Sequence, residues 1–324
     1  MIFSKIIGHK EIIASLLKTL RENERLPPAF LFSGPSGVGK KLVARGWAQG
    51  LLCQEKIKPC GKCSSCLRVE TSHHSDLHIV SNSDSANIKI EQIRQLQNSL
   101  ALRAFEGHSK IAIIDQAHSM TNQGANSLLK TLEEPPAHCY FILVTSNKGA
   151  LPITIQSRCQ NIMFGSLGRS EISQIVSTAE DWALRLSQGR VDLAQQFTDE
   201  TYRNLRKSAL VALRDLPISR VYEGFNKMGE LSEDRDTALF TIQCWMQVIK
   251  NAVASQLHSP LALAPDEIEI IELLAKKFSS VALLSMGQRL FRLEQDVQSN
   301  VNKTLAFEKF WIDTKSTLTM GETN

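Results

Sequence analysis

The stretch that decides the fold is Ala29-Phe30-Leu31-Phe32-Ser33-Gly34-Pro35-Ser36-Gly37-Val38-Gly39-Lys40-Lys41. It joins an apolar run of strand type to a Gly-rich turn, and a helical pattern follows over residues 42–52. This order predicts a phosphate-binding loop, because glycines let backbone N–H groups converge on phosphate oxygens. The positive end of the following helix points to the same place, and Lys40 adds a charge for the outer phosphates.

Position 41 departs from a working loop of this kind, in which a Ser or Thr hydroxyl ligates Mg²⁺. The residue here is Lys41, whose protonated amine has no lone pair to offer a metal. Two unit charges at ~4 Å repel by about 4 kcal/mol at an effective dielectric of ~20, and a divalent ion roughly doubles this. Hydrolysis is badly compromised if Lys41 points into the site, and the hydroxyl is missing even if it points to solvent. We therefore expect a phosphate-binding scaffold that does not bind Mg²⁺ and for which ATP binding is doubtful.

Length and composition describe an ordinary globular chain of two or three domains, with 324 residues, 43% of them hydrophobic and 22% charged. The net charge of +4 permits contact with nucleic acid or acidic partners without arguing for it. Residues 1–10 lack the apolar core of a signal peptide, and no run approaches the ~20 apolar residues of a membrane span. We expect a cytoplasmic protein without a membrane partner, in which clustered cysteines serve as metal ligands before disulfides.

Four cysteines follow the predicted loop and helix, at Cys53, Cys60, Cys63 and Cys66. Four soft thiolates suit a tetrahedral Zn²⁺, and Cys-x2-Cys spacing lets two sulfurs from one tight turn reach one ion. Free surface cysteines are the weaker interpretation of this spacing. A site closed by four cysteines keeps no open position, so we expect a structural zinc that holds together a small excursion without its own core. One of the nearby histidines, His73, His74 and His78, could replace a cysteine as ligand, but we favour exposed loop residues for all three.

A second altered position follows the apolar run of residues 109–114. Asp115 ends this run, as expected of a buried parallel strand that carries a carboxylate at its tip. In nucleotide hydrolases such an Asp helps to hold Mg²⁺, and a Glu that polarises the attacking water commonly follows. The residue here is Gln116, and an amide cannot take up the proton. Capping of the next turn is the structural alternative for Asp115. Together, Lys41 and Gln116 predict that this chain does not hydrolyse nucleotide itself.

Further helices and strands complete an α/β pattern. We expect helices over 9–25, 88–102 and 121–134 and buried strands over 76–80, 109–115 and 140–147. Thr145 begins the polar tip of the last of these strands, where the carboxyl ends of parallel strands meet a ligand. A short helical approach then leads to Ser157-Arg158-Cys159.

The phosphate-binding loop, the four cysteines and two later motifs occur in a characteristic order. The later motifs are Ser157-Arg158-Cys159 and, before it, Leu128-Leu129-Lys130-Thr131-Leu132-Glu133-Glu134-Pro135-Pro136. In these motifs the chain resembles bacterial clamp-loader subunits of the AAA+ class over residues 1–165. The resemblance implies a rigid subunit of a ring that opens the sliding clamp and places it on primed DNA. Its implied neighbours are a gamma/tau-type ATPase subunit and a delta-type subunit.

The resemblance also implies a role for Arg158. An Arg on the rim of a nucleotide-binding domain can reach a neighbour's ATP, where its planar fork stabilises the transferring phosphoryl group. Such an arginine finger contributes about 10³–10⁵ in rate in other systems. A surface salt bridge is the alternative. We favour the finger in trans, because it needs no working ATP site in its own chain.

The remaining sequence is helical in pattern. Residues 166–204 resemble the small lid of AAA+ modules, in which Arg190 falls near the place of a sensor arginine, although a solvated Arg at a helix start fits better. Residues 205–324 show apolar stripes of a helical bundle, and the resemblance implies an oligomerising collar. Wide stripes around Trp245 and Trp311 would form core first and could also bury against neighbouring subunits.

The prediction is therefore an α/β, AAA+ type P-loop domain with a zinc-binding insertion, followed by a helical lid and an all-α collar. Its degenerate nucleotide site comprises Gly34, Gly37, Gly39, Lys40, Lys41, Asp115, Gln116 and Thr145. The main alternative function is an active gamma/tau-like ATPase motor, and Lys41 and Gln116 argue against it. A zinc-dependent nucleic-acid adaptor is a weaker hypothesis, because the cysteine region has only four basic residues and no aromatic side chains on which bases could stack.

Overall fold

The computed structural model describes residues 1–21, 26–82, 87–106, 109–216, 221–258, 265–299 and 301–321. They form two compact units, of which the first comprises Met1–Ser177 and Gln188–Asp192 and the second Thr178–Ser187 and Leu193–Asn324. This division falls inside the segment 166–204 that the sequence predicts as a lid, and the three-part division of the chain stays a prediction. No helix among the described residues is long and apolar enough to cross a bilayer.

The first unit is built on a parallel sheet that, in the described residues, has five strands in the order β2-β3-β4-β1-β5. The strands are β1 Ala29–Ser33, β2 Leu77–Val80, β3 Lys110–Ile114, β4 Cys139–Thr145 and β5 Gln160–Met163. Ser33 at the end of β1 pairs with Thr145 at the end of β4, and Ile114 at the end of β3 pairs with Leu143. The carboxyl ends of the three central strands therefore meet at one edge of the sheet, as expected for a ligand site.

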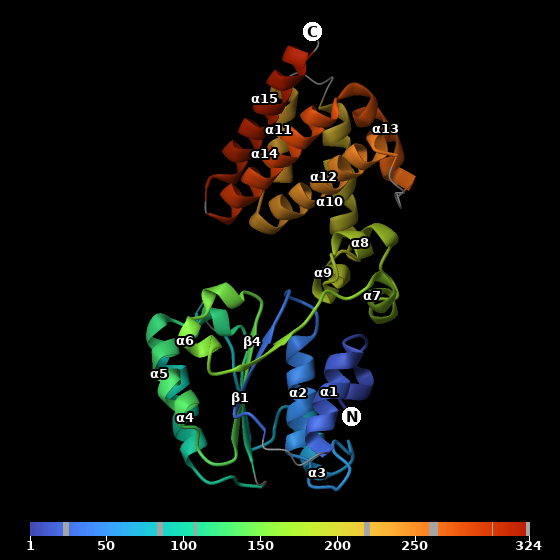
Figure 1. Cartoon of the computed structure of the whole chain (residues 1–324). Helices are drawn as coiled ribbons and strands as arrows, with labels where there is room; N and C mark the ends of the chain where they lie inside the picture. The colour runs from blue at the N-terminus through green and yellow to red at the C-terminus, as the bar shows by residue number, and fades with distance from the viewer. Residues whose placement is uncertain are drawn as a thin grey trace. The chain divides into compact units, whose positions relative to one another are not determined.

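Helices cover both faces of this sheet, with α1, α2 and α3 on one side and α4, α5 and α6 on the other (Figure 1). They span α1 Lys10–Arg21, α2 Lys40–Leu51, α3 Ser64–Glu70, α4 Ile90–Ala101, α5 Asn122–Glu133 and α6 Ile153–Gln156. Strand β1 contributes side chains to the cores on both faces of the sheet, because successive side chains point to opposite faces. Phe30 and Phe32 pack with Trp47 of α2, whereas Leu31 packs in the core that holds α4 and α5.

Sequence and structure differ at a few elements of this unit. Helix α1 ends at Arg21, and residues 22–25 of the predicted helix lie outside the described residues. Strand β5 was not predicted, since it is a largely exposed edge strand with little apolar signal. Helix α3 inside the cysteine region was not predicted either. Short helices complete the unit: η1 Phe3–Lys5, η2 Ala117–Ser119, η3 Lys148–Ala150 and α7 Arg169–Ile175.

The second unit is helical throughout its described residues, as the sequence predicts. Its helices are α8 Asp181–Leu186, α9 Val191–Gln196 (which begins in the first unit), α10 Glu200–Asp215, α11 Val221–Leu231, α12 Arg235–Gln256, α13 Pro265–Lys277, α14 Ser280–Gln298 and α15 Lys303–Gly321. Trp245 and Trp311 are fully buried within this unit and belong to its core, as predicted. Contact of their surroundings with a neighbouring subunit stays a prediction.

Candidate functional site

The predicted phosphate-binding loop links β1 to α2, as its sequence requires. Its glycines Gly34, Gly37 and Gly39 cannot be replaced without strain. Gly34 has φ +144°, and a Cβ there would lie 2.2 Å from the carbonyl oxygen of Phe164. Gly39, at φ +93°, immediately precedes α2, and a Cβ there would meet no atom within 4 Å. The backbone of the loop thus keeps the left-handed conformations and the open approach that a phosphate needs.

Lys40 is the first residue of α2 and is almost completely buried. Its Nζ donates hydrogen bonds to the carbonyl oxygens of Gly34, at 2.7 Å, and of Pro35. Burial lowers the pKa of Lys40 to about 8, against the opposing influence of the Asp115 and Asp192 carboxylates. The amine is therefore held against the loop backbone, beside the place where outer phosphates bind.

Lys41 points into the site, which answers the question that the sequence left open. Its Nζ lies 3.0 Å from Oδ2 of Asp115, the residue that follows β3. The two side chains are 47% and 16% exposed, so this ion pair lies at the mouth of the site rather than in free solvent. Asp115 is the carboxylate expected to face Mg²⁺, and here its partner is an ammonium group of the same chain.

A cavity of about 210 Å³ lies at this edge of the sheet. Its described lining consists of Ser36, Gly37, Gly39, Lys40, Lys41, Asp115, Gln116, His118, Val144, Thr145 and Ser146. All the predicted nucleotide-site residues except Gly34 line the cavity directly, and Gly34 holds the Lys40 amine from behind. The side chain of Gln116 is exposed, and its backbone has φ +50°.

His118 is a site residue that the sequence reasoning missed. Its Nδ1 lies 3.2 Å from the hydroxyl oxygen of Thr145, and both residues line the cavity. Burial lowers the pKa of His118, and the nearby charge of Lys40 lowers it further, so the imidazole is neutral at physiological pH. Its position three residues after Asp115, which follows β3, is the sequence feature that could have placed His118 in the site.

A second missed contact comes from residues 188–192, which belong to the same unit. The backbone N–H of Val191 donates to the carbonyl of Gly37 at 3.0 Å, and the Asp192 carboxylate lies against the same glycine. Arg190 donates to both carboxylate oxygens of Asp192, at 3.2 and 2.8 Å. The Arg190 side chain is partly exposed and lies just before α9. It is not among the described residues that line the cavity.

Arg158 lies apart from this cavity, between α6 and β5. Its guanidinium pairs with Glu133 at the end of α5 and donates to the carbonyl of Thr154 at 2.9 Å. The side chain is 34% exposed. An exposed ion pair of this kind stabilises a fold by only about 0–1 kcal/mol, so it does not fix Arg158 in place.

The four predicted cysteines come together, with every pair of their sulfurs within 4.8 Å. Tetrahedral zinc with Zn–S bonds of about 2.3 Å separates its sulfurs by roughly 3.8 Å, and the Cys60 and Cys66 sulfurs are 3.8 Å apart. Backbone N–H groups of Lys62 and Cys63 donate to the Cys60 sulfur and lower the pKa of that thiol to about 6, whereas burial raises the pKa of Cys66. This donor set fits one soft metal ion with all four positions filled by protein.

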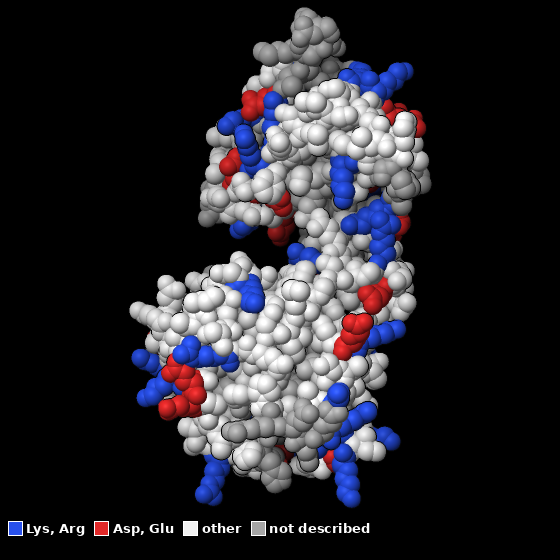
Figure 2. Space-filling model, in the orientation of Figure 1, with Lys and Arg blue, Asp and Glu red and all other residues white. Residues whose placement is uncertain are grey.

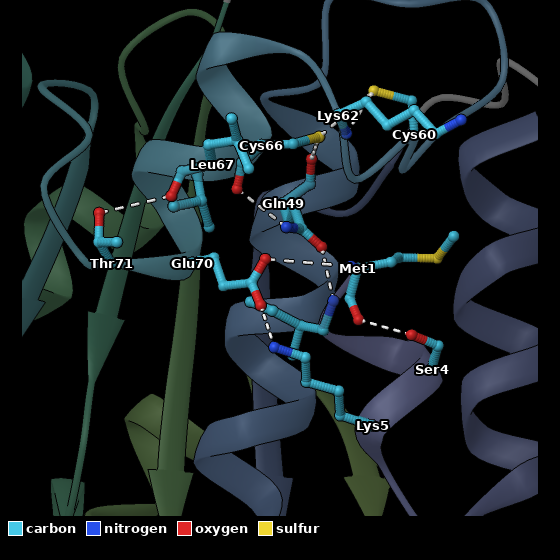
Figure 3. Close-up of polar contacts among 12 residues, drawn as sticks. Met1, Ser4, Lys5, Gln49, Cys60, Lys62, Cys66, Leu67, Glu70 and Thr71 are labelled. Atoms are coloured by element: carbon cyan, nitrogen blue, oxygen red, sulfur yellow. Dashed lines mark hydrogen bonds and ion pairs between the residues drawn. The ribbon is translucent and has the colours of Figure 1, made fainter.

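The cysteine module is fastened to the helix that carries the phosphate-binding loop. Gln49 of α2 is fully buried; its amide donates to the carbonyl of Cys66 and its oxygen accepts from the N–H of Ile2, both at 2.9 Å. Figure 3 shows Gln49 between Cys66 and the N-terminal segment. One turn earlier, Arg45 donates to the carbonyl of Glu70 at the end of α3, at 2.7 Å. Helix α2 thus holds the loop at its start and the cysteine module along its second half.

The expectation of exposed histidines is wrong for His74, which is buried. The Ser65 hydroxyl donates to the carbonyl of Leu52 at 2.7 Å and lies 2.9 Å from His74 Nε2, so this nitrogen is the donor of that contact. His74 Nδ1 accepts from the backbone N–H of Asp76 at 3.0 Å. Both ring nitrogens are therefore engaged within the fold, and His74 has none left for a metal. His73 is exposed, whereas His78 is half-buried on β2.

Most of the first unit is similar in sequence to known proteins. Residues 8–168 match the family described as DNA polymerase III, delta subunit. Subunit tau/gamma of DNA polymerase III from Haemophilus influenzae is 37% identical over 174 residues, which cover 53% of this chain and 25% of that protein. Subunit delta' of DNA polymerase III from Bacillus subtilis is 40% identical over 156 residues, which cover 48% of this chain and 47% of that protein.

A solved structure of a DNA polymerase III gamma subunit-related protein from Thermotoga maritima aligns with 94% of this chain and 99% of that chain. Its identity is 16% and its TM-score 0.49. The chain spans from about a quarter to half the length of the two relatives named above. Through residues 8–168, it belongs to the family of DNA polymerase III clamp-loader subunits.

Proposed function

We propose that this chain is a non-hydrolysing, delta-prime-like subunit of a DNA polymerase III clamp loader. The observation that carries the proposal is the ion pair between Lys41 and Asp115, 3.0 Å apart, where a hydrolase holds Mg²⁺. Lys41 stands where a hydrolase has the hydroxyl that ligates Mg²⁺, and its ammonium group neutralises Asp115, the carboxylate that would face the metal. Gln116 adds a second loss, because it cannot act as a base toward water.

The alternative is a gamma/tau-like motor, since relatives of both kinds match the chain at similar identity. A motor requires Mg²⁺ between the phosphates and the site, with a hydroxyl and a carboxylate among its ligands. In this chain Lys41 would have to leave Asp115 and a water would have to replace the hydroxyl. The two altered side chains lie in one cavity and impair the same step, so we favour the non-hydrolysing subunit.

Arg158 is the residue that we propose to act on a neighbour. It is exposed, lies outside the cavity of its own chain, and is held by a surface ion pair with Glu133 and a hydrogen bond to the Thr154 carbonyl. Release from that pair costs little, whereas a guanidinium fork placed on the transferring phosphoryl group lowers the barrier substantially. In this proposal the neighbour is a gamma/tau-type ATPase subunit, and a delta-type subunit, the sliding clamp and primed DNA complete the assembly.

We further propose that the four cysteines hold a structural zinc ion and that the protein works in the cytoplasm, without ATP hydrolysis of its own. The zinc would be held by Cys53, Cys60, Cys63 and Cys66 and would supply folding energy to the module rather than catalysis. Polymerase activity would belong to the whole holoenzyme.

A nucleic-acid adaptor built on the cysteine module has less support. Of the basic residues there, Arg68 is already paired with Glu106. On the face drawn in Figure 2, the described Lys and Arg side chains lie in small groups among neutral and acidic residues rather than in one stripe. Contact with DNA is better made by the assembled ring than by this chain alone.

The arginine-finger role can be separated from a structural role by two variants of one ion pair. Arg158→Ala should lower the ATPase rate of the reconstituted assembly by about 10³-fold at the affected site. Glu133→Gln removes the same ion pair but leaves the guanidinium, so its ATPase rate should stay near that of the wild type. Equal defects in the two variants would assign Arg158 to the salt bridge, and an unchanged rate with Arg158→Ala would refute the finger.

A further inference from the structure

We propose that the degenerate loop still binds a polyphosphate, as a nucleoside diphosphate or as pyrophosphate, and that it does so without a divalent metal. Lys41 is then the resident cation of the site. This inference rests on the proposed function, because it assigns a ligand to the same non-hydrolysing loop. It goes further in stating that loss of the metal does not empty the site.

The anion-binding part of the site is intact. The backbone at Gly39 is left-handed and open, and α2 begins at the next residue, so free N–H groups at its start face the cavity. Lys40 lies beside them with its amine on the loop carbonyls. None of these groups depends on Mg²⁺, because backbone donors and an ammonium group act on phosphate oxygens directly.

The charges of the cavity also favour an anion without metal. Lys40 and Lys41 supply two cations against one carboxylate, Asp115, among its described lining residues. Lys41 neutralises Asp115 at 3.0 Å, and Arg190 neutralises the Asp192 carboxylate that lies against Gly37, so both carboxylates near the loop are paired. A metal ion brought with the phosphates would meet the Lys41 ammonium at the place where it needs an oxygen ligand. Metal-free phosphate is therefore the form that this arrangement selects.

The size of the cavity limits the ligand. Its volume of about 210 Å³ is smaller than the ~300–1,000 Å³ typical of sites that enclose a whole drug-sized ligand. Its described lining residues include no aromatic side chain other than His118. The cavity thus fits the phosphate groups of a nucleotide, with any ribose and base outside it.

The test is calorimetric titration of the full-length protein with pyrophosphate and with ADP, each in excess EDTA and again in excess Mg²⁺. We expect binding in EDTA that Mg²⁺ weakens. Equal affinity for the two ligands would identify the phosphates alone as the recognised group, and tighter binding of ADP would identify a nucleotide; both results support the proposal. Absence of binding in EDTA would overturn it, whether or not Mg²⁺ restores binding.

Two variants at position 41 sharpen the test. Lys41→Met should weaken binding in EDTA about tenfold or more, because it removes one charge-assisted contact. Lys41→Thr should show the same loss in EDTA and should gain affinity on addition of Mg²⁺. Lys130→Thr, an exposed lysine of α5, serves as the matched control and should change nothing. Unchanged metal-free binding in both Lys41 variants would refute the role of Lys41.

Failure of this inference can be distinguished from failure of the proposed function. A protein that binds no phosphate in EDTA and hydrolyses no ATP would overturn the metal-free site alone. Hydrolysis of ATP by the protein with Mg²⁺ would overturn the proposed function.

Discussion

Helix α2 carries two sites that differ in how complete they are. At its start, the phosphate-binding loop keeps its backbone shape, but the side chains that hold Mg²⁺ and activate water are replaced. From its middle onward, Arg45 and Gln49 hold the cysteine module, where the four cysteines that could bind a metal converge. The loop depends on backbone conformation, and the module depends on side-chain ligands.

This difference shows what each site contributes to the protein. A backbone cradle can lose its chemistry and still join β1 to α2, because the strand and helix packing maintain it. A four-cysteine module has little core of its own, so loss of its ligands removes the fold of that segment. In the proposed function, the complete set of four cysteines reflects a structural requirement, whereas the altered loop reflects the loss of a catalytic one.

The largest expected effect concerns the module. The double variant Cys60→Ser, Cys63→Ser should reduce the zinc content from one ion per chain to none. It should lower the free energy of unfolding by more than about 4 kcal/mol, since structural metal binding is folding energy. Metal analysis and denaturant unfolding measure the two quantities. Cys244→Ala, at a buried cysteine outside the module, should keep the zinc. A wild-type protein without zinc, or a double variant as stable as the wild type, would contradict the account.

A smaller effect concerns the fastening between the two sites. Gln49→Ala leaves the buried carbonyl of Cys66 and the N–H of Ile2 without their partner. It should lower the free energy of unfolding by about 2–4 kcal/mol and speed zinc release to a chelator. Gln97 makes two comparable amide contacts on α4, to Ser127 and Thr131, far from the cysteines in sequence. Gln97→Ala should leave zinc release unchanged, and equal release in both variants would remove Gln49 from this role.

The smallest effect concerns Lys40 at the loop. Its pKa is lowered to about 8, below its ordinary value of 10.5, so between these values the unfolded chain binds a proton that the folded chain does not. Stability should therefore rise with pH through this window, by about 1 kcal/mol per pH unit at most, and this contribution should be absent below pH 8. Denaturant midpoints of wild type and Lys40→Met from pH 7 to 10 measure the difference. A stability that falls in the wild type relative to the variant would contradict the lowered pKa.

Much of the first unit could be predicted from the sequence, because buried parallel strands appear as apolar runs with polar ends. The loop, Asp115 and Thr145 were placed together on this basis, and the structure brings them to one cavity. Cys-x2-Cys spacing likewise predicted the cysteine cluster. Edge strand β5 escaped prediction because it is short and largely exposed.

Other features depend on contacts between distant residues and had no local signal. The direction of Lys41 is set by Asp115, which follows it by more than seventy positions. The approach of Asp192 to Gly37 has the same origin. Trp245 and Trp311 were placed correctly in the core, but the sequence could not show that the bundle covers them completely.

The central claim is that the loop at the start of α2 does not hydrolyse nucleotide, and ATP turnover by the purified chain with Mg²⁺ tests it most directly. We predict no turnover above that of a Lys40→Ala control. Turnover by the wild-type chain that disappears in Lys40→Ala would contradict the account and would identify the protein as a motor subunit.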